Sequence, residues 1–275
     1  MKTTNRFFMA LTAMLLLFST TVFSQDDAPA EVKYYVVSTA HWNMDYEDFD
    51  METWKAVEKE LLDNVTAKNE HILVSSVYLH HTTPDNSEIM FVQGFGSWNA
   101  IHEAPARSNE LAKEAWPDDN ARAAFFDKQG AYYSPLHSDE IYATLPGAKN
   151  FVEAPKDGMI LAFRKSYRAY PKDGTNEEFA ELRDSYIENV INKNELVKAW
   201  FPAAHYYGAN STERITGVFF DSLADYDAHF KRNTELAKEA WPDEAERKER
   251  GEKVDKYWTG VHGDFIYTLV GGLSK

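Results

Sequence analysis

The feature that most constrains the fold is a nine-residue segment that occurs twice. The sequence ELAKEAWPD stands at 110–118 and again at 235–243, 125 positions later. Without any gap, 29 of 118 positions are identical between 33–150 and 158–275. Similarity at one fixed spacing over most of a chain indicates a duplicated domain. We therefore predict two repeats, 33–150 and 158–275, joined by a linker over 151–157.

The first 24 residues have the pattern of a cleaved export signal. Lys2 and Arg6 make the start positive, and a mostly apolar run over 9–18 follows. Small residues then precede a cleavage position near Ser24 and Gln25. The apolar run is too short to span a membrane, which takes about 20 apolar residues. The sequence predicts a signal peptide over 1–24, an exported chain (periplasmic or secreted), and no integral membrane segment after cleavage.

Composition excludes several classes of protein. The formal net charge is −15, which repels phosphate backbones, so we expect no nucleic-acid partner. The chain has no cysteine, so disulfides, thiolate catalysis and cysteine metal sites are excluded. Hydrophobic residues make up 44% of the chain, enough to fill two packed cores.

Each repeat shows the same series of patterns, in the order strand, helix, strand, strand, helix, strand. The predicted strands, rich in β-branched and aromatic residues, cover 34–42, 72–81, 88–95 and 139–145, and then 159–167, 197–206, 213–220 and 264–270. Apolar stripes at helical spacing lie between the first and second strands of each repeat. Further charged helical segments are predicted at 119–130 and 244–255. Pro202 lacks a backbone N–H, which favours an edge position for its strand.

This order is that of the ferredoxin-like fold, in which both helices cover one face of an antiparallel sheet. The other face of each sheet must be covered too, and packing the two sheets together does so within one chain. The predicted class is therefore α+β, with two tandem ferredoxin-like (βαββαβ) repeats packed sheet to sheet.

One stretch also resembles a known superfamily. The run FFDSLADY at 219–226, leading into LAKEAWPD at 236–243, is similar to the third strand and second helix of the dimeric α+β barrel superfamily. The likeness is to its NIPSNAP-like and antibiotic-biosynthesis-monooxygenase-like (ABM-like) branches. The resemblance implies a pseudo-dimeric barrel with a cavity, formed here by a single chain. It carries over no activity.

Polar residues shared by both repeats are the candidates for a site. They are His80 and His205 at the ends of the second strands, and His137, Asp139, Tyr142, His262, Asp264 and Tyr267 at the fourth strands. Residues two apart on a strand share a face, so Asp139 could orient the ring of His137, and Asp264 that of His262. An imidazole held this way suits a general base or a metal ligand. The alternative for the same pairs is that they cap the turn before the strand, with Tyr142 and Tyr267 in the core.

The ends of the first strands differ between the repeats. His41, Trp42 and Asn43 correspond to Ser166, Tyr167 and Arg168. A site of two equal halves is therefore not expected, and at most one half would be active. The acidic segment 45–50 could suggest calcium, but it lacks the ligand spacing and central glycine of an EF-hand, so no metal site is predicted.

Three hypotheses about function remain open at this point. The main one is an exported barrel protein that binds a small, partly apolar molecule in its cavity. The first alternative is a cofactor-independent monooxygenase or a haem-handling enzyme, because the resembling superfamily contains both. The second is a non-catalytic structural or interaction module with a filled barrel. The sequence assigns no catalytic residue, and haem is the one cofactor under consideration.

Overall fold

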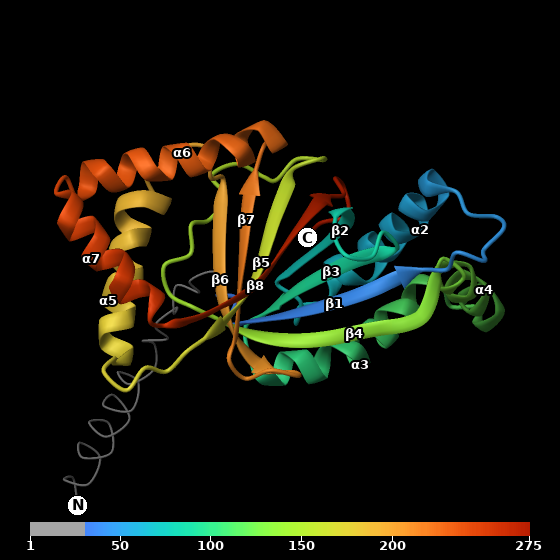
Figure 1. Cartoon of the computed structure of the whole chain (residues 1–275). Helices are drawn as coiled ribbons and strands as arrows, with labels where there is room; N and C mark the ends of the chain where they lie inside the picture. Colours follow the sequence, from blue (N-terminus) through green and yellow to red (C-terminus); the bar gives the residue numbers. More distant parts are fainter. Residues whose placement is uncertain (1–30) are drawn as a thin grey trace, which may run out of the picture. The chain divides into compact units, whose positions relative to one another are not determined.

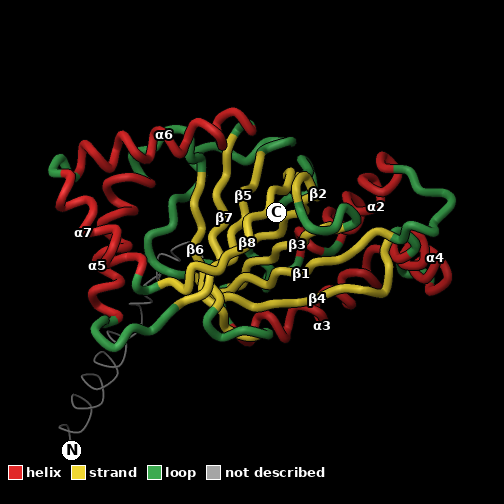
Figure 2. Tube along the Cα trace, viewed as in Figure 1, coloured by secondary structure: helices red, strands yellow, loops and turns green. Residues whose placement is uncertain are grey.

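Eight antiparallel strands close into one barrel in the computed structural model, which describes residues 31–275 (Figures 1 and 2). The predicted signal peptide lies outside the described residues. The strands are β1 (Tyr34–Trp42), β2 (Val74–Thr82), β3 (Glu88–Phe95), β4 (Tyr133–Thr144), β5 (Ile160–Arg168), β6 (Ala199–Tyr207), β7 (Glu213–Phe220) and β8 (Trp258–Leu269). The predicted α+β class and the barrel are confirmed.

Helices lie outside the barrel in two groups, with α2, α3 and α4 beside β1–β4 and α5, α6 and α7 beside β5–β8 (Figure 1). They are α2 (Met51–Asn64), α3 (Trp98–Ala115), α4 (Asp119–Gly130), α5 (Asn176–Tyr186), α6 (Leu223–Ala240) and α7 (Glu244–Asp255), with a 3₁₀ turn η1 (Thr66–Lys68) and a π-helical turn η2 (Ile187–Ile191). Side-chain oxygens cap the helix starts: Asp50 accepts from the backbone N–H of Thr53 at 2.7 Å. Ser97 and Ser222 do the same for α3 and α6. The charged segments predicted as helices are α4 and α7.

The order around the barrel is β1-β3-β2-β8-β5-β7-β6-β4. Strands of the first half thus run β4-β1-β3-β2, and those of the second run β8-β5-β7-β6. The two sets meet at two seams, β2–β8 and β4–β6, and each seam carries a register shift. Backbone pairing at the seams, which the sequence does not predict, joins the two four-stranded sheets edge to edge and leaves no open strand edge in the barrel.

The seams also correct two local predictions. β6 is not an edge strand, because it pairs with β7 on one side and β4 on the other. Pro202 is tolerated there because it lies where the overlap with β4 ends, and its carbonyl accepts from the backbone N–H of Leu145 at 3.0 Å. β4 and β8 start six residues earlier than predicted. Their early residues reach past a bulge to pair Tyr133 with Trp42 and Trp258 with Arg168.

The barrel interior is filled by a hydrophobic core to which all eight strands contribute. Its buried residues include Val37, Tyr78, Met90, Tyr142, Phe163, Ala203, Ile215, Phe219 and Tyr267. Smaller clusters lie between the strands and the helices, such as Trp54, Val77, Ile89 and Tyr132 in the first half. The residues that alternate with the core positions along each strand therefore face the helices or solvent.

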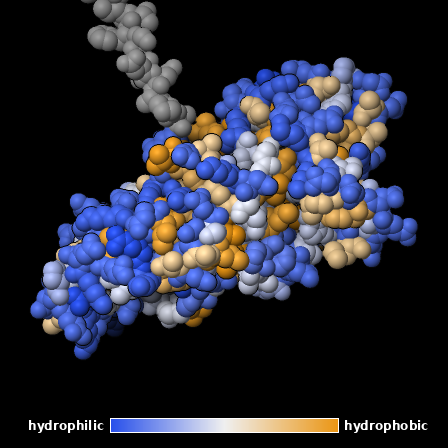
Figure 3. Space-filling model, turned by 90° about the horizontal axis from the view of Figure 1, so that it is seen from above, coloured by the Kyte–Doolittle hydropathy of each residue, from blue (hydrophilic) through white to orange (hydrophobic). Residues whose placement is uncertain are grey.

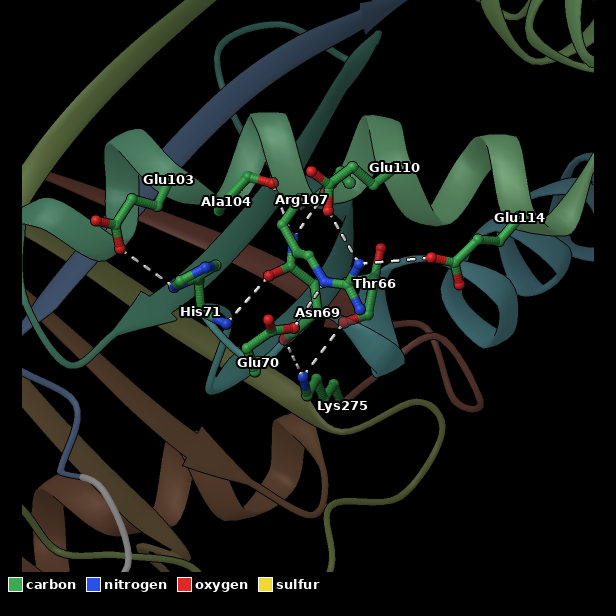
Figure 4. Close-up of polar contacts among 11 residues, drawn as sticks. Thr66, Asn69, Glu70, His71, Glu103, Ala104, Arg107, Glu110, Glu114 and Lys275 are labelled. Atoms are coloured by element: carbon green, nitrogen blue, oxygen red, sulfur yellow. Dashed lines mark hydrogen bonds and ion pairs between the residues drawn. The ribbon is translucent and has the colours of Figure 1, made fainter.

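The segment after the last strand of each half crosses to the other half. The Lys275 ammonium donates to the backbone carbonyls of Asn69 at 2.7 Å and Thr66 at 3.3 Å, at the end of the first helix of the first half (Figure 4). In return, Lys149 donates to the carbonyl of Asn194 at 2.8 Å in the second half. Cations at carbonyl-rich helix ends are favourable. The crossing tails tie the halves together beyond the two seams.

The surface seen from above mixes apolar and polar side chains, with most of the apolar ones in the middle of that face (Figure 3). Within residues 31–275, none of the helices has the length and apolar character needed to cross a membrane.

Candidate functional site

The strongest polar site lies inside the barrel wall at the β4–β6 seam. It consists of Glu140 and Tyr142 on β4, Lys165 on β5 and Glu213 on β7, and we call it the Tyr142 cluster. The alternation of the strands explains the grouping. Phe163 and Ile215 face the core, so Lys165 and Glu213, two positions away on the same strands, face it too.

Hydrogen bonds and ion pairs join all four side chains. The Tyr142 hydroxyl contacts Glu140 Oε2 at 2.8 Å and also donates to Glu213 Oε1. Lys165 Nζ lies 2.7 Å from Glu140 Oε2 and 3.7 Å from Glu213 Oε1. Tyr142 and Glu140 come from the first half, Lys165 and Glu213 from the second. The cluster therefore exists only where the two halves meet.

The cluster is buried on one side and open on the other. The side chains of Lys165 and Glu140 are 26% and 23% exposed, whereas that of Glu213 is 7% exposed. Tyr142 is 1% exposed. A small molecule reaching the seam would therefore meet Lys165 and Glu140 first, with Glu213 and Tyr142 behind them.

The charges set the protonation of the cluster. Burial, the bond to Glu213 and the negative charges of both glutamates raise the pKa of Tyr142 far above its ordinary value, so it stays a neutral donor. Burial alone would raise the pKa of Glu140. The hydrogen bond and charge of Lys165, with the Tyr142 hydroxyl, outweigh burial, and the pKa of Glu140 is lowered overall. Glu140 is thus a stable anion that holds Lys165 in place.

A related but simpler group lies at the other seam. The Tyr267 hydroxyl, on β8, donates to Glu88 Oε2, on β3, at 3.2 Å. In the 125-residue alignment these two residues correspond to Tyr142 and Glu213, and again each comes from a different half. The positions of Glu140 and Lys165 are taken by Phe265 and Ala40. This Tyr267 cluster therefore has the Tyr–Glu bond without the ammonium group and the second carboxylate.

The structure separates the predicted site residues into two sets. Tyr142 and Tyr267 lie in the core, and His80 and His205 lie half-buried next to them, because β2–β8 pairs His80 with Tyr267 and β4–β6 pairs Tyr142 with His205. The charge of His205 contributes to lowering the pKa of Glu140. Nδ1 of His80 is 3.1 Å from the Thr83 hydroxyl.

The two His–Asp pairs lie elsewhere. His137 Nε2 is 3.4 Å from Asp139 Oδ2, and His262 Nε2 is 3.3 Å from Asp264 Oδ2, so each carboxylate does hold its ring. All four side chains are about half exposed or more, because their strand positions alternate with those of the core tyrosines. Asp264 also binds Arg164 at 2.7 Å. These pairs do not face the barrel interior.

Sequence reasoning missed Glu213, Glu88, Glu140 and Lys165. A signal for the first two was present, since Glu88 and Glu213 are identical in the alignment of the repeats and begin strands that are otherwise largely apolar. Glu140 and Lys165 have no matching partner in the other repeat. A search restricted to shared residues could not find them.

The described residues offer neither a metal site nor space for a haem inside the barrel. Within residues 31–275, no group of three or more His, Asp or Glu side chains is placed to hold a metal ion. The barrel is filled by packed side chains, among them Phe163, Phe219 and Tyr78, each at most 6% exposed. A haem would have to displace this core, and His80 and His205 lie at its margins. The barrel interior does not fit a haem.

Comparisons with solved structures agree on the fold. A candidate monooxygenase from Lactobacillus acidophilus matches 88% of this chain and 97% of its own, with a TM-score of 0.54 and 13% identity. A candidate monooxygenase from Fusobacterium nucleatum gives a TM-score of 0.56, 11% identity and coverage of 89% and 97%. A mutant chlorite dismutase from Candidatus Nitrospira defluvii gives 0.54, 12% identity and coverage of 88% and 93%. No protein family and no curated sequence matches the chain.

These likenesses define the class of protein that the chain is similar to. Its α+β barrel is of the kind found in monooxygenase-like and chlorite dismutase-like proteins, over most of its length. At this level of identity the similarity shows the fold alone.

Proposed function

We propose that the protein is a cofactor-independent oxygenase that acts on a small, acidic organic molecule at the Tyr142 cluster. The observation that carries the proposal is a buried carboxylate, Glu213, held beside an ammonium group and a neutral phenol at the edge of an apolar barrel. The candidate monooxygenases with the same fold support this class of reaction over a non-catalytic module.

The proposed reaction begins with removal of a proton. Lys165 Nζ lies 2.7 Å from Glu140 and 3.7 Å from Glu213, so Glu213 is the carboxylate that the ammonium group binds less closely, and we assign it as the base. It takes a proton from a CH₂ group next to a carbonyl, and the resulting enolate is stabilised by the Lys165 ammonium and the Tyr142 hydroxyl.

Molecular oxygen is the co-reactant. The enolate adds to O₂, and the peroxide loses water, so that CH₂ and O₂ become C=O and H₂O. One oxygen atom stays in the product, the other leaves as water, and the carbon is oxidised as oxygen is reduced. The protein supplies the base and the positive charge. It also supplies an apolar surrounding, which excludes water from the enolate and O₂.

The architecture around this site belongs to the same proposal. We propose that residues 33–150 and 158–275 are two tandem ferredoxin-like repeats with a linker at 151–157, supported by the identical segments and by the matching strand orders. The pattern of 1–24 supports export of the protein. The NIPSNAP-like and ABM-like resemblance rests on the sequence of 219–226 and 236–243.

Oxygen uptake tests the function directly. The purified protein would be screened with 1,3-dicarbonyl compounds and hydroxylated aromatic ketones in an oxygen electrode. Glu213→Gln should lower turnover by about 100-fold or more, the usual contribution of a positioned base. Glu88→Gln in the Tyr267 cluster is the matched control and should leave turnover unchanged. Oxygen uptake that does not depend on Glu213, or the absence of uptake with every compound, would refute the proposal.

If the protein binds these compounds without consuming oxygen, the second candidate function, ligand binding without catalysis, is favoured. The Tyr142 cluster would then hold a small, partly apolar molecule by hydrogen bonds alone. Quenching of tryptophan fluorescence by the same compounds, lost in Tyr142→Phe but without oxygen uptake, would support that function.

A further inference from the structure

Arg168 is a buried arginine at the end of β5, on the opposite face of the strand from the Tyr142 cluster. It is 5% exposed. Its guanidinium carbon lies 3.6 Å from the centroid of the Phe179 ring in the first turns of α5, and 5.2 Å from that of Tyr257. Among residues 31–275, its Nε finds no hydrogen-bond partner. A buried guanidinium with an unused donor is unusual, because buried polar groups are normally bonded.

A second arginine is directed to the same place. Arg214, on β7, pairs in register with Ser166, two residues before Arg168, so Arg168 and Arg214 are diagonal neighbours on one face of the sheet. Arg183 on α5 adds a third positive charge nearby. Burial first, and then the charges of Arg214 and Arg183, lower the pKa of Arg168.

The acidic groups around this face are occupied by other partners. Glu178 is 2.9 Å from Lys256 and accepts from the Tyr257 hydroxyl. Asp184 accepts from Arg183 at 2.7 Å. The side chain of Glu213 points to the opposite face of β7, with only its backbone carbonyl bonded to Arg214. In the described part of the chain, no carboxylate is one of the main causes of the shift in the pKa of Arg168.

The first half has no such concentration of charge. The positions of Arg168, Arg183 and Arg214 are taken there by Asn43, Glu58 and Ile89. Asn43 donates to the backbone carbonyl of Ala131 at 3.1 Å, and Ile89 is fully buried. The fold therefore does not need a cation here, and the three arginines are a property of the second half.

We propose that Arg168 and Arg214 form a binding site for a small oxoanion, the phosphate, sulfate or carboxylate group of a small molecule, beside the start of α5. A guanidinium presents two parallel N–H groups that match the oxygens of such an anion. The anion supplies the counter-charge that the described residues do not. The site is separate from the proposed oxygenase, which uses the inner face of the same strands.

Inorganic phosphate is the probe. The full chain would be titrated with phosphate at constant ionic strength, kept with sodium chloride, and ³¹P line broadening and the Tm would be recorded. We expect saturable binding by the wild type and a rise in Tm that follows the same curve. Arg168→Met, which keeps the side-chain length and removes the charge, should weaken binding by about tenfold or more.

Two further variants make the outcome decisive. Arg214→Met replaces a half-exposed side chain and should also weaken binding, even if Arg168→Met fails to fold. Arg107→Met is the control, since Arg107 is already paired with Glu70 at 3.0 Å in the first half, and it should bind phosphate like the wild type. Absence of saturable binding by the wild type, or binding by both Arg168→Met and Arg214→Met as tight as that of the wild type, would overturn the proposal.

Discussion

The two seams of the barrel hold the same bond in different electrostatic settings. At both, a buried tyrosine from one half donates to a glutamate from the other, as Tyr142 does to Glu213 and Tyr267 to Glu88. Around Tyr142 a second carboxylate and an ammonium group complete the cluster. Around Tyr267 an aromatic ring and a methyl group take their places.

The difference between the two seams distinguishes the Tyr–Glu bond, which the fold uses at both, from the extra charged residues, which are present only at the Tyr142 cluster. A Tyr–Glu bond at each seam is enough to satisfy a buried phenol and to join the halves. Glu140 and Lys165 are not needed for that purpose, because the Tyr267 cluster does without them. Keeping charges partly buried costs stability, which points to a function at the Tyr142 cluster.

The largest effect is expected from removing the cation. Lys165→Met leaves Glu140 and Glu213 close together without a positive charge between them. We expect a loss of about 2 kcal/mol in the free energy of unfolding at pH 7, less than for a fully buried pair because Lys165 is partly exposed. Urea unfolding followed by tryptophan fluorescence measures it.

A double variant is the control for this prediction. Glu140→Phe combined with Lys165→Ala gives the Tyr142 cluster the composition of the Tyr267 cluster. It should be closer in stability to the wild type than Lys165→Met is, because no unpaired charge is left. If the double variant is the less stable one, the two seams are not equivalent in packing and the comparison fails.

Removing one hydroxyl at a time compares the two bonds. Tyr142→Phe should cost about 1.5 kcal/mol, the lower end of the range for a hydrogen bond to a charged group, because solvent can reach one side of the cluster. Tyr267→Phe should cost about 1 kcal/mol, because its single bond to Glu88 is longer, at 3.2 Å. The same urea experiment gives both values. A larger loss from Tyr267→Phe would contradict the assignment of the stronger network to the Tyr142 seam.

The smallest expected effect is on the pH dependence of stability, which should have opposite signs for Glu140 and Glu58. The pKa of Glu140 is lowered from 4.5, so the stability it contributes is present above pH 4.5 and is lost as the pH falls through its folded pKa. Burial raises the pKa of Glu58 from 4.5, against the hydrogen bonds from Tyr133 and Gln129. Its contribution is present below pH 4.5 and is lost as the pH rises through its folded pKa.

Glutamine variants test these signs. Glu140→Gln should flatten the acid side of the stability profile, and Glu58→Gln should lessen the loss of stability as the pH rises toward 7. Unfolding by urea at a series of pH values from about 3 to 7 gives both profiles. If both variants change the pH dependence of stability by the same amount and in the same direction, the surroundings of the two carboxyl groups do not control their protonation.

Most of the fold could be predicted from the sequence, because its signals are local or repeated. The composition of the strands, the apolar stripes at helical spacing and the 125-residue repeat indicate the elements and their order. The seams could not be predicted, since pairing between β2 and β8 depends on contacts about 190 residues apart, which leave no local pattern. For the same reason, Pro202 suggests an edge strand in the sequence, although β6 pairs with strands on both sides.

The candidate site was harder to predict than the fold. Shared residues led to Tyr142 and Tyr267, and also to His137 and His262, which lie on the outside. A repeat shows what both halves have kept. It gives no information about residues that one half has gained, such as Lys165 and Arg168.

The closing strand of the barrel has a consequence for synthesis of the protein. β8 is the last strand to leave the ribosome, and it pairs with β2 of the half that was made first. At about 5–20 residues per second, the roughly 130 residues that follow β4 take about 7–26 s to be made. Until β8 is made, the β2 edge of the first half has no partner strand, and an unpaired edge of this kind is prone to pair with other chains.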